Sequence, residues 1–448
     1  YNDAVTFNLF DRVNNTETVV IPESFAGDYR IRVIGASVPD APQAFAMVIL
    51  QGGGVYPYLP SGDDADLAFH SDGSPVLAYA NEGDEIDTLD DVGVHRWMGT
   101  YGDGNDFHRW VELRDKWFSH GFQSMGAYSI PRLEAAVMPP GCDADDMTVA
   151  VHPTNDNVYT AFVFNNADSN IYDSVYVRYF NGSQWLNLGT SFRDRGICGS
   201  GTAYRHASSP SIQVGADGRP IVAYVQQYRW SGEYVTYREV VVKRWNGAAW
   251  VGMDGSADGF VGFHNNAAGV DMVVDGSGNP VVTWKDTQQL KIKAFRWGGS
   301  WSQMGQLLGS LLPSSTGLPR LAYDDGNFYL AWVELVANPL PQRCVFVAQS
   351  SGGGWTGLGS SMTLGVSTNA GSSPQKCFVG AGNGQLYVAW ENNTGDGMEF
   401  FARNWDGTSW VGVDGSDQSP GLAANLGEGS RYNTTLCSFR VNPSGLPT

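Results

Sequence analysis

The chain has 448 residues, among them 56 Gly, 21 Pro and 15 Trp, and only 16% of its residues are charged. This composition is typical of an all-β protein rich in turns and argues against a disordered or mainly helical chain. Acidic residues outnumber basic ones by 46 to 27, and the net charge of −19 argues against nucleic acid as a partner, because a phosphate backbone would be repelled. No run of 18 apolar residues occurs, so the sequence predicts no membrane span.

The first segment, residues 1–53, differs from everything that follows. Its apolar stretches predict four strands, at residues 6–10, 17–21, 28–35 and 45–52. Three blocks stand out: Val-Asn-Asn-Thr-Glu at 13–17, Ala-Gly-Asp-Tyr-Arg-Ile-Arg-Val at 26–33, and Pro-Gln-Ala-Phe-Ala-Met-Val at 42–48. In order and spacing, residues 1–52 resemble the C-terminal half of the β-sandwich that follows the catalytic domain in many secreted subtilisin-like serine proteases. The resemblance implies an extracellular accessory region.

The same resemblance implies no catalytic residue in this segment. The nucleophile stretch Gly-Thr-Ser-Met-Ala of those proteases occurs nowhere in the sequence, so we do not expect the chain to cleave peptides. Half of a sandwich would leave an apolar face bare, which predicts an upstream segment or a neighbouring subunit that covers it. Alternatively, these strands pack on the following domain or complete its last repeat, since consecutive elements usually lie next to one another.

Residues 54–448 carry a repeat with two signatures in each unit. The first is a turn, an apolar run, and then a small residue followed by an aromatic one; its six copies end at Ala78-Tyr79, Ala161-Phe162, Ala223-Tyr224, Thr283-Trp284, Ala331-Trp332 and Ala389-Trp390. The second is an aromatic residue, a Gly-containing turn and a closing Trp; it ends at Trp185, Trp250, Trp301 and Trp410, with looser copies at Trp355 and at the pair Trp97 and Trp110. Each unit therefore predicts two hairpins, or four antiparallel strands.

Four strands repeated every 50 to 80 residues or so are the blade pattern of a β-propeller. The sequence thus predicts an all-β fold of six complete blades, preceded by part of a β-sandwich, and the propeller resembles secreted Trp-rich repeat propellers. A seventh unit begins with an innermost strand at residues 434–441, a turn at Ser444-Gly445 and the start of a second strand at residues 446–448. We expect the native polypeptide to continue, or strands from its N-terminal side to close the ring.

Acidic clusters precede the innermost strands of the first two blades. They contain Asp63, Asp64 and Asp66 in the first, and Asp143, Asp145 and Asp146 in the second. Alternate carboxylates on an irregular loop can supply the oxygen ligands of Ca²⁺. No complete calcium-binding loop with a closing Glu is present, so a solvated acidic turn is the competing explanation.

The stretch from His95 to His120 departs most from the repeat. It holds His95, His108, Arg109, Trp110, Trp117 and His120. Long loops that depart from a repeat often carry binding functions. We therefore predict a ligand or partner surface there.

The repeated Trp residues have two explanations. An exposed Trp offers a flat face on which a sugar ring can stack, as in a propeller lectin, whereas a large aromatic at the same place in every unit is favoured as core packing. A propeller glycosidase is a further alternative. The Asp-box pattern of sialidases has no full match in the sequence, and such an enzyme needs two converging carboxylates.

Five cysteines permit disulfides in an extracellular protein. The spacing allows Cys142 to pair with Cys198 and Cys344 with Cys377, which leaves Cys437 unpaired. The sequence as a whole predicts a secreted or surface-bound region, non-catalytic, that binds a protein or glycan or assembles with itself, as an accessory part of a larger protease or surface protein. The alternatives are a propeller lectin or glycosidase, and a structural subunit of an extracellular filament or layer.

Overall fold

The computed structural model describes residues 65–81, 91–100, 108–112, 142–166, 172–191, 195–199, 203–262, 265–309, 318–337, 341–367, 373–393, 398–413 and 438–448. All of them belong to one compact unit, Pro60–Gly121 with Tyr128–Thr448. Within these ranges no helix is long and apolar enough to cross a membrane. Residues 1–53 lie outside the described ranges, so the sandwich and its boundary stay predictions.

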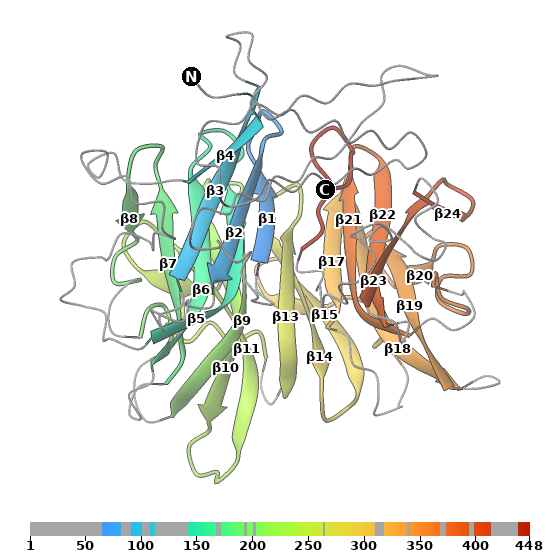
Figure 1. Ribbon diagram of the computed structural model, residues 1–448. Coiled ribbons are helices and arrows are strands. Elements are labelled where there is room, and N and C mark those ends of the chain that lie inside the picture. Colours follow the sequence, from blue (N-terminus) through green and yellow to red (C-terminus); the bar gives the residue numbers. More distant parts are fainter. Residues whose placement is uncertain are drawn as a thin grey trace, which may run out of the picture. The chain divides into compact units, whose positions relative to one another are not determined.

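The described strands form six four-stranded antiparallel sheets, and within each sheet the strands follow in chain order (Figure 1). The first three sheets contain β1 (Ala65–Phe69), β2 (Pro75–Asn81), β3 (Asp91–Thr100), β4 (His108–Glu112), β5 (Cys142–Val151), β6 (Val158–Asn166), β7 (Ser174–Phe180), β8 (Trp185–Asn187), β9 (Tyr204–Val214), β10 (Pro220–Arg229), β11 (Thr236–Trp245) and β12 (Trp250–Gly252). The last three contain β13 (Ala267–Val274), β14 (Pro280–Asp286), β15 (Lys291–Trp297), β16 (Trp301–Gln303), β17 (Arg320–Asp324), β18 (Asn327–Ala337), β19 (Pro341–Ser350), β20 (Thr356–Gly357), β21 (Pro374–Gly382), β22 (Gln385–Asn393), β23 (Met398–Trp405) and β24 (Trp410–Gly412).

Consecutive sheets meet along their first strands. β1 contacts β5, and the same relation links β5 to β9, β9 to β13, β13 to β17 and β17 to β21. Four-stranded sheets joined in this way are the blades of a β-propeller, so the predicted fold and its six blades are confirmed.

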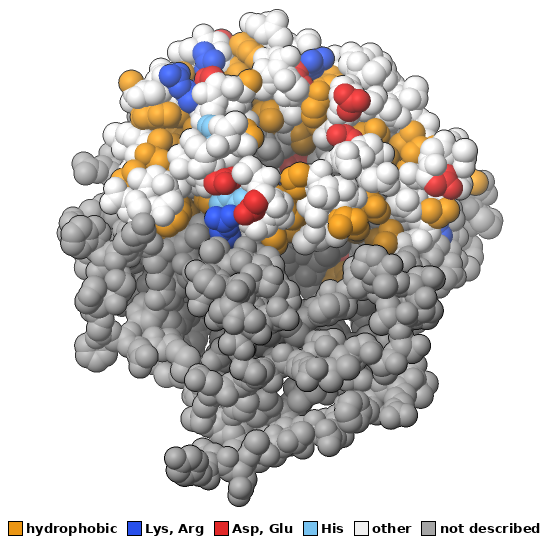
Figure 2. Space-filling model, turned by 90° about the horizontal axis from the view of Figure 1, so that it is seen from above, with side chains coloured by type: hydrophobic (Ala, Val, Ile, Leu, Met, Phe, Trp, Pro, Cys, Tyr) orange, Lys and Arg blue, Asp and Glu red, His pale blue; other side chains and the backbone are white. Residues whose placement is uncertain are grey.

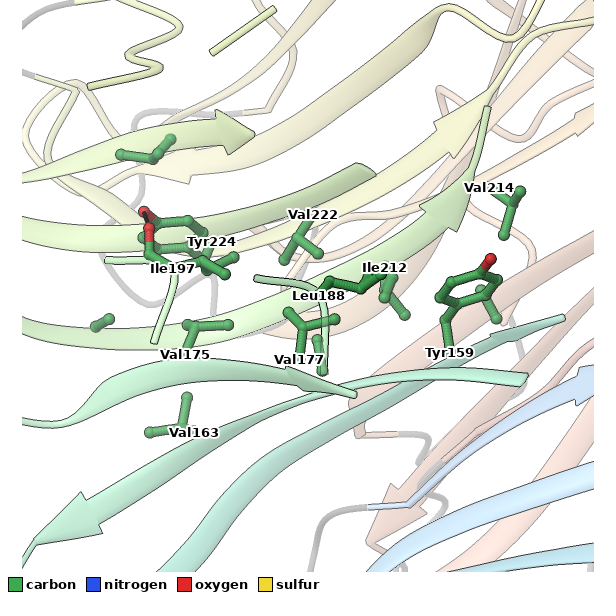
Figure 3. Close-up of a cluster of buried hydrophobic side chains, with 14 residues drawn as sticks. Tyr159, Val163, Val175, Val177, Leu188, Ile197, Ile212, Val214, Val222 and Tyr224 are labelled. Atoms are coloured by element: carbon green, nitrogen blue, oxygen red, sulfur yellow. Dashed lines mark hydrogen bonds between the residues drawn. The ribbon is translucent and has the colours of Figure 1, made fainter. Parts of the chain in front are cut away.

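A hydrophobic cluster fills the wedge between neighbouring blades, and it explains the first repeated signature. In blade 5, Trp332 packs into the cluster shared with blade 4, while Ala331 packs into the cluster shared with blade 6. In blade 6, likewise, Trp390 packs into the cluster shared with blade 5, whereas Ala389 packs into the cluster on the opposite face of the sheet. Because neighbouring residues of a strand point to opposite faces, the aromatic side chain fills the wedge on one face of the blade. The small side chain on the other face leaves room for the next segment of the chain to pack closely. Figure 3 shows the cluster between blades 2 and 3, where Tyr224 is the aromatic residue.

The second signature also joins blades. The indole Nε1 of Trp250 donates a hydrogen bond to the backbone oxygen of Leu188 in the preceding blade at 3.2 Å. Trp355 and Trp410 repeat this contact, with distances of 2.9 and 3.2 Å to the preceding blade. Each Trp side chain within the described ranges is buried or half-buried, which favours core packing as the reason for the repeat.

One glycine turn is required by close packing between blades. Gly278, in the β13–β14 turn, has a φ of +76°, a conformation that favours glycine. A Cβ atom there would lie 2.1 Å from the backbone nitrogen of Ala216 in the neighbouring blade. A side chain at this position would therefore push the two turns apart.

The last residues form a hairpin where the sequence predicts the start of a seventh blade. Arg440 and Thr448 exchange backbone hydrogen bonds of 3.0 and 2.8 Å. Phe439 of this C-terminal hairpin (residues 438–448) is buried against blade 6. Residues 434–437 lie outside the described ranges.

The predicted disulfide between Cys344 and Cys377 is not formed, since both are free, buried thiols. Cys344 faces the wedge between blades 4 and 5, whereas Cys377 faces the wedge between blades 5 and 6. Cys198 is also a free thiol, so its predicted bond with Cys142 is not formed either; its sulfur accepts a hydrogen bond from a backbone N–H at 3.2 Å. The side chains of Cys142 and Cys437 lie outside the part of the chain that the structure describes.

Candidate functional site

The first strands of the blades surround a hollow of about 100 Å³, which we call the axial channel. Its lining comes from all six blades and the C-terminal hairpin: Ala65, Asp66, Asp146, Met147, Thr148, Ser209, Pro210, Ser211, Val270, Asp271, Leu318, Arg320, Phe378, Ser438 and Arg440. Carboxylates and guanidinium groups therefore line one common space, which makes the channel a candidate site. On the face seen in Figure 2, by contrast, acidic and basic side chains are scattered among hydrophobic ones.

Two carboxylates of the channel hold the next blade in the same way. Asp146 accepts a hydrogen bond from the backbone N–H of Ser209 at 2.6 Å. Asp271 accepts one from the backbone N–H of Leu321 at 2.8 Å. In both cases the donor belongs to the first strand of a neighbouring blade. These side chains therefore tie blades together around the channel.

Asp66 makes the corresponding contact and also closes the ring. It accepts a hydrogen bond from the backbone N–H of Val149 in blade 2 at 3.1 Å. Its Oδ1 atom accepts hydrogen bonds from Ser438 Oγ and from the guanidinium of Arg440, each at 2.9 Å. The negative charge of Asp66 is the main cause of the raised pKa of Arg440. Burial acts in the opposite direction, and the charge of Asp271 raises the pKa further. A charge-assisted contact thus holds the C-terminal hairpin to blade 1.

Arg320 is the second guanidinium of the channel, and it stacks on an aromatic ring. Its Cζ lies 4.9 Å from the centre of the Phe378 ring, which is a cation–π distance. The ring fixes the position of a positive charge that lines the channel.

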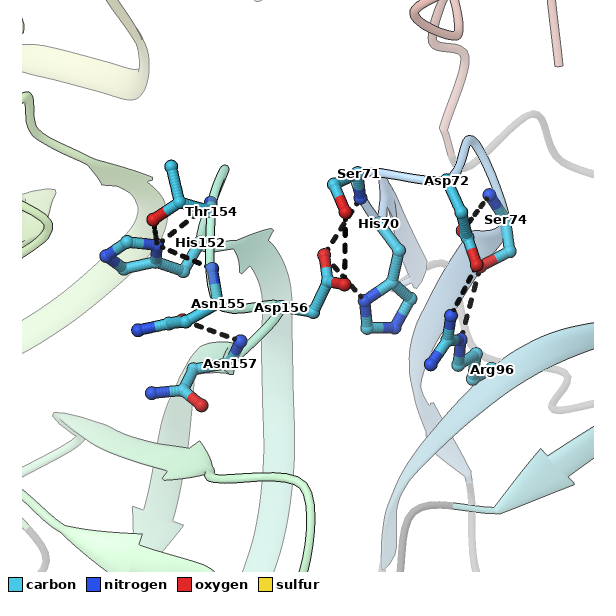
Figure 4. A network of polar contacts seen from close by, with 10 residues as sticks. All are labelled: His70, Ser71, Asp72, Ser74, Arg96, His152, Thr154, Asn155, Asp156 and Asn157. Carbon is cyan, nitrogen blue, oxygen red and sulfur yellow. Dashed lines mark hydrogen bonds and ion pairs between the residues drawn. The ribbon is translucent and has the colours of Figure 1, made fainter.

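A second polar network joins the β1–β2 and β5–β6 turns (Figure 4). Asp156 accepts hydrogen bonds from the backbone N–H of Ser71 at 2.8 Å and from its hydroxyl at 3.1 Å, and it lies 3.4 Å from His70 Nδ1. Burial is the main cause that lowers the pKa of His70, and Arg96 adds to it. Arg96 in turn pairs with Asp72 at 2.7 Å. The network joins blades 1 and 2 around a buried titratable group.

Several residues predicted as a ligand surface lie in regular strands. His95 belongs to β3, and three more belong to β4, namely His108, Arg109 and Trp110. Trp97 stands directly opposite Trp110, which confirms the looser copy of the second signature. The expectation of a loop at His95 and at residues 108–110 is therefore corrected, because these positions lie in two antiparallel strands that pair with each other.

Whether those residues bind a ligand stays a prediction. The side chains of the four strand residues, and the whole of Trp117 and His120, lie outside the part of the chain that the structure describes.

The predicted calcium ligands are placed in part. Asp66 and Asp146 line the channel and accept backbone N–H groups. Within the described ranges, no group of three or more His, Cys, Asp or Glu side chains is placed to hold a metal ion. Ca²⁺ stays a prediction for the remaining residues, which lie outside those ranges wholly or in their side chains: Asp63, Asp64, Asp143 and Asp145.

Asp271, Arg320 and Arg440 are channel residues that the sequence did not reveal. A single charged residue within a strand gives no periodic signal of its own. The repeat offered one usable clue, since Asp271 and Arg320 both stand on the strand that pairs with the first signature.

No protein-family model and no curated protein matches the sequence of the chain, whereas a search of solved structures finds distant similarities. The Hadza microbial sialidase Hz136 is similar with a TM-score of 0.43 and 10% identity over 74% of this chain, which spans 63% of that protein's length. A levansucrase mutant from B. megaterium is similar with a TM-score of 0.38 and 11% identity, and the match covers 61% of this chain and 85% of the levansucrase. An exo-β-1,3-galactanase from Clostridium thermocellum is similar with a TM-score of 0.32 and 13% identity, and the match covers 58% of this chain and 60% of the galactanase.

Similarities this distant do not indicate an activity. The β-propeller fold is established by the six sheets of the chain itself.

Proposed function

We propose that this chain is a non-catalytic binding or assembly region of an extracellular protein, with residues 1–53 as an accessory sandwich and the propeller as the binding domain. The supporting observation is that the channel carboxylates are engaged in hydrogen bonds between blades. Asp66, Asp146 and Asp271 each hold a neighbouring blade through a backbone N–H group. Glycoside hydrolysis requires one carboxyl to donate a proton and another to act as base or nucleophile at the same sugar ring. Carboxylates committed to the framework are poorly placed for either task.

The test is an activity screen of the purified chain against chromogenic glycosides and soluble polysaccharides, with Asp271→Asn as the variant. We expect no turnover above the blank from either protein, and a lower melting temperature for Asp271→Asn. Turnover by the wild-type chain that disappears in a folded Asp271→Asn or Asp146→Asn variant would overturn the proposal.

The second candidate is a propeller that binds or cleaves glycans in its channel, and Arg320 is the observation that favours it. A guanidinium held in place by stacking is pre-organised for a carboxylate, so the ligand would be an acidic sugar. Calorimetric titration with galacturonate oligomers tests this candidate. Binding that is lost in Arg320→Met would support it, whereas equal heats from the two proteins would remove it.

Assembly is the other form that the proposed function can take. If a second subunit completes the sandwich strands, the chain of residues 1–448 should oligomerise, and a chain that begins at residue 54 should be monomeric. Light scattering coupled to gel filtration measures both masses. Monomers in both cases would remove self-assembly and leave binding.

A further inference from the structure

Blade 3 carries a group of aromatic side chains that the repeat does not explain. They lie at the base of the β10–β11 hairpin, which projects at the lower edge of Figure 1. Tyr204 on β9 stands directly opposite Tyr228 on β10, and the rings of Trp230 and Phe260 lie against Tyr228. We call these four residues the blade 3 aromatic cluster.

The rings of the cluster are packed mainly edge to face. Ring centres are 4.9 Å apart for Tyr204 and Tyr228, 4.8 Å for Tyr228 and Trp230, and 5.1 Å for Tyr228 and Phe260. This geometry matches the favourable arrangement of aromatic quadrupoles. All four residues are half-buried and keep part of their surface accessible to solvent, whereas a wedge aromatic such as Trp284 is fully buried.

Hydrogen bonds lock two of the rings in place. The indole Nε1 of Trp230 donates to Glu239 Oε1 at 2.8 Å, and Glu239 Oε2 accepts the backbone N–H of Asn265 at 3.1 Å. Glu239 is fully buried, so its carboxylate serves this framework. The hydroxyl of Tyr204 donates to Asp258, and burial together with this contact raises the pKa of Tyr204. The cluster is therefore rigid before any ligand arrives, which reduces the entropy lost on binding.

One polar group with a direct contact borders the cluster, the carboxylate of Asp258, which accepts the Tyr204 hydroxyl. Asp258 and Arg229 are exposed, and the Nε of Arg229 donates to the backbone oxygen of Glu233 at 3.0 Å. The guanidinium Cζ of Arg229 also lies 5.9 Å from the centre of the Tyr234 ring, which is 94% exposed. Aromatic rings beside a carboxylate can stack on the C–H face of a sugar and bond its hydroxyl groups.

From this arrangement we propose that the blade 3 aromatic cluster binds carbohydrate, with a sugar ring against Tyr228 and Trp230. Asp258 supplies an acceptor for its hydroxyl groups. The inference rests on the proposed binding function and names its ligand class and its surface.

A protein partner matches this surface less well. A stable protein interface needs about 800 Å² on each side, with a substantial apolar core. Among the described residues of this hairpin, the large apolar side chains that are exposed are Tyr234 and Val235. Two such side chains beside half-buried rings suit a small polar ligand rather than a broad protein contact.

The experiment titrates the full chain with four soluble hexasaccharides: those of β-1,4-glucose, β-1,3-glucose, β-1,4-xylose and β-1,4-N-acetylglucosamine. Binding is measured by calorimetry and by the change in Trp fluorescence. We expect at least one probe to bind, and Tyr228→Leu and Trp230→Leu to weaken it at least tenfold. Trp230→Phe keeps a ring but loses the hydrogen bond to Glu239, so it should weaken binding less than Trp230→Leu does.

The matched control is Trp297→Leu, because Trp297 is also half-buried and pairs with a second aromatic ring, Trp301, at 5.4 Å in blade 4. We expect this variant to bind like the wild type. Circular dichroism of each variant shows whether it is folded, and only folded variants are compared.

The outcomes separate this inference from the proposed function. If no probe binds, or if binding is unchanged in folded Tyr228→Leu and Trp230→Leu, the carbohydrate inference is overturned. Should a probe bind through these residues and be hydrolysed in the same mixture, the inference stands while the non-catalytic function fails. Capture of a protein that depends on Tyr228, without any sugar binding, would also overturn the inference and leave the binding function in place.

Discussion

Among single side chains, Asp66 is the most heavily used in the channel. In blade 2 it accepts hydrogen bonds from Thr148 Oγ1 at 2.8 Å and from the N–H of Val149. In the C-terminal hairpin its donors are Ser438 and Arg440. One carboxylate thus joins blade 1 to both of its neighbours, and its removal leaves a guanidinium and several other donors without their acceptor.

We expect Asp66→Ala to lower the free energy of unfolding by about 1–3 kcal/mol, the usual effect of leaving donors without their acceptor, because Asp66 is buried and Arg440 is half-buried. Urea denaturation followed by Trp fluorescence measures it. The control is Asp72→Ala, because Asp72 forms a comparable ion pair with Arg96 but is exposed, and exposed pairs contribute about 0–1 kcal/mol. Equal losses in the two variants would contradict the role given to Asp66.

His70 gives a prediction about pH. Its pKa is lowered in the folded state from the ordinary 6.5, by burial and by Arg96, against the opposing effect of Asp156 and Asp72. The unfolded chain therefore binds the proton more tightly than the folded one. The stabilisation is fully present above pH 6.5, and the free energy of unfolding falls as pH drops through 6.5 toward the folded pKa.

The measurement compares melting temperatures of the wild type and His70→Gln between pH 7.5 and 5. The variant should lose less stability across this interval than the wild type does. His206→Gln serves as the control, because His206 is an exposed residue paired with Asp173 at 2.7 Å. Parallel curves for wild type and His70→Gln would show that burial of this group does not control the pH dependence.

Some of these residues can be recognised from the sequence as candidates, but their interactions in the fold cannot be predicted from it. Asp66 is recognisable as part of an acidic cluster, and the pattern suggested a metal ligand, because residue type and spacing do not show which way a carboxylate points. The backbone N–H donors of the next blade have no signal in the sequence. Arg440 was missed for another reason, since its partner lies 374 positions away.

Between strands and blades, the alternation of a small and an aromatic residue on each second strand is the main source of cohesion. Trp390 fills the wedge between blades 5 and 6, where it is 2% exposed and stacks on Phe401 at 5.6 Å. Ala389, beside it, faces the other way. This pairing was predictable from the sequence, because it recurs at one place in every unit and depends only on residue size.

Trp390→Ala should lower the free energy of unfolding by about 3–5 kcal/mol, since it removes a large buried ring and leaves a cavity. Thermal or urea unfolding measures the loss. Trp405→Ala is the comparison, because Trp405 is only half-buried on the outer hairpin and should give a smaller loss. A larger effect at Trp405 than at Trp390 would show that the outer hairpins, not the wedges, hold the blades together.

For the propeller as one ring, blade number and blade order were readable from the repeat, and the C-terminal hairpin stands where a seventh unit was expected. The cysteine pairing was not readable, because Cys344 and Cys377 lie on adjacent blades but face different wedges. The blade 3 aromatic cluster was also missed. Its residues come from β9, from the end of β10 and from the loop after β12, and only the fold brings them together.

The C-terminal hairpin gives a prediction for the whole ring. Phe439 covers Phe378, Tyr387 and Ala389 of blade 6. Phe439→Ala should therefore expose part of this cluster, raise binding of the dye ANS and lower the melting temperature. Leu446→Ala is the matched control on the same hairpin, because Leu446 is 59% exposed and should have little effect. If Leu446→Ala were the more damaging change, contacts other than this cluster would hold the hairpin.

The contact of Asp66 with Ser438 and Arg440 also sets the order in which the chain can fold. The wedge clusters join blades that are neighbours in sequence, so they can form one after another during synthesis. The contact at Asp66 spans at least 372 positions and cannot form until the C-terminal hairpin has left the ribosome. Such long-range closure is slow, because a large loop must be ordered before its contacts form. The ring is thus expected to exist first as an open arc, and the seam between blade 1 and the C-terminal hairpin is where its folding ends and its unfolding begins.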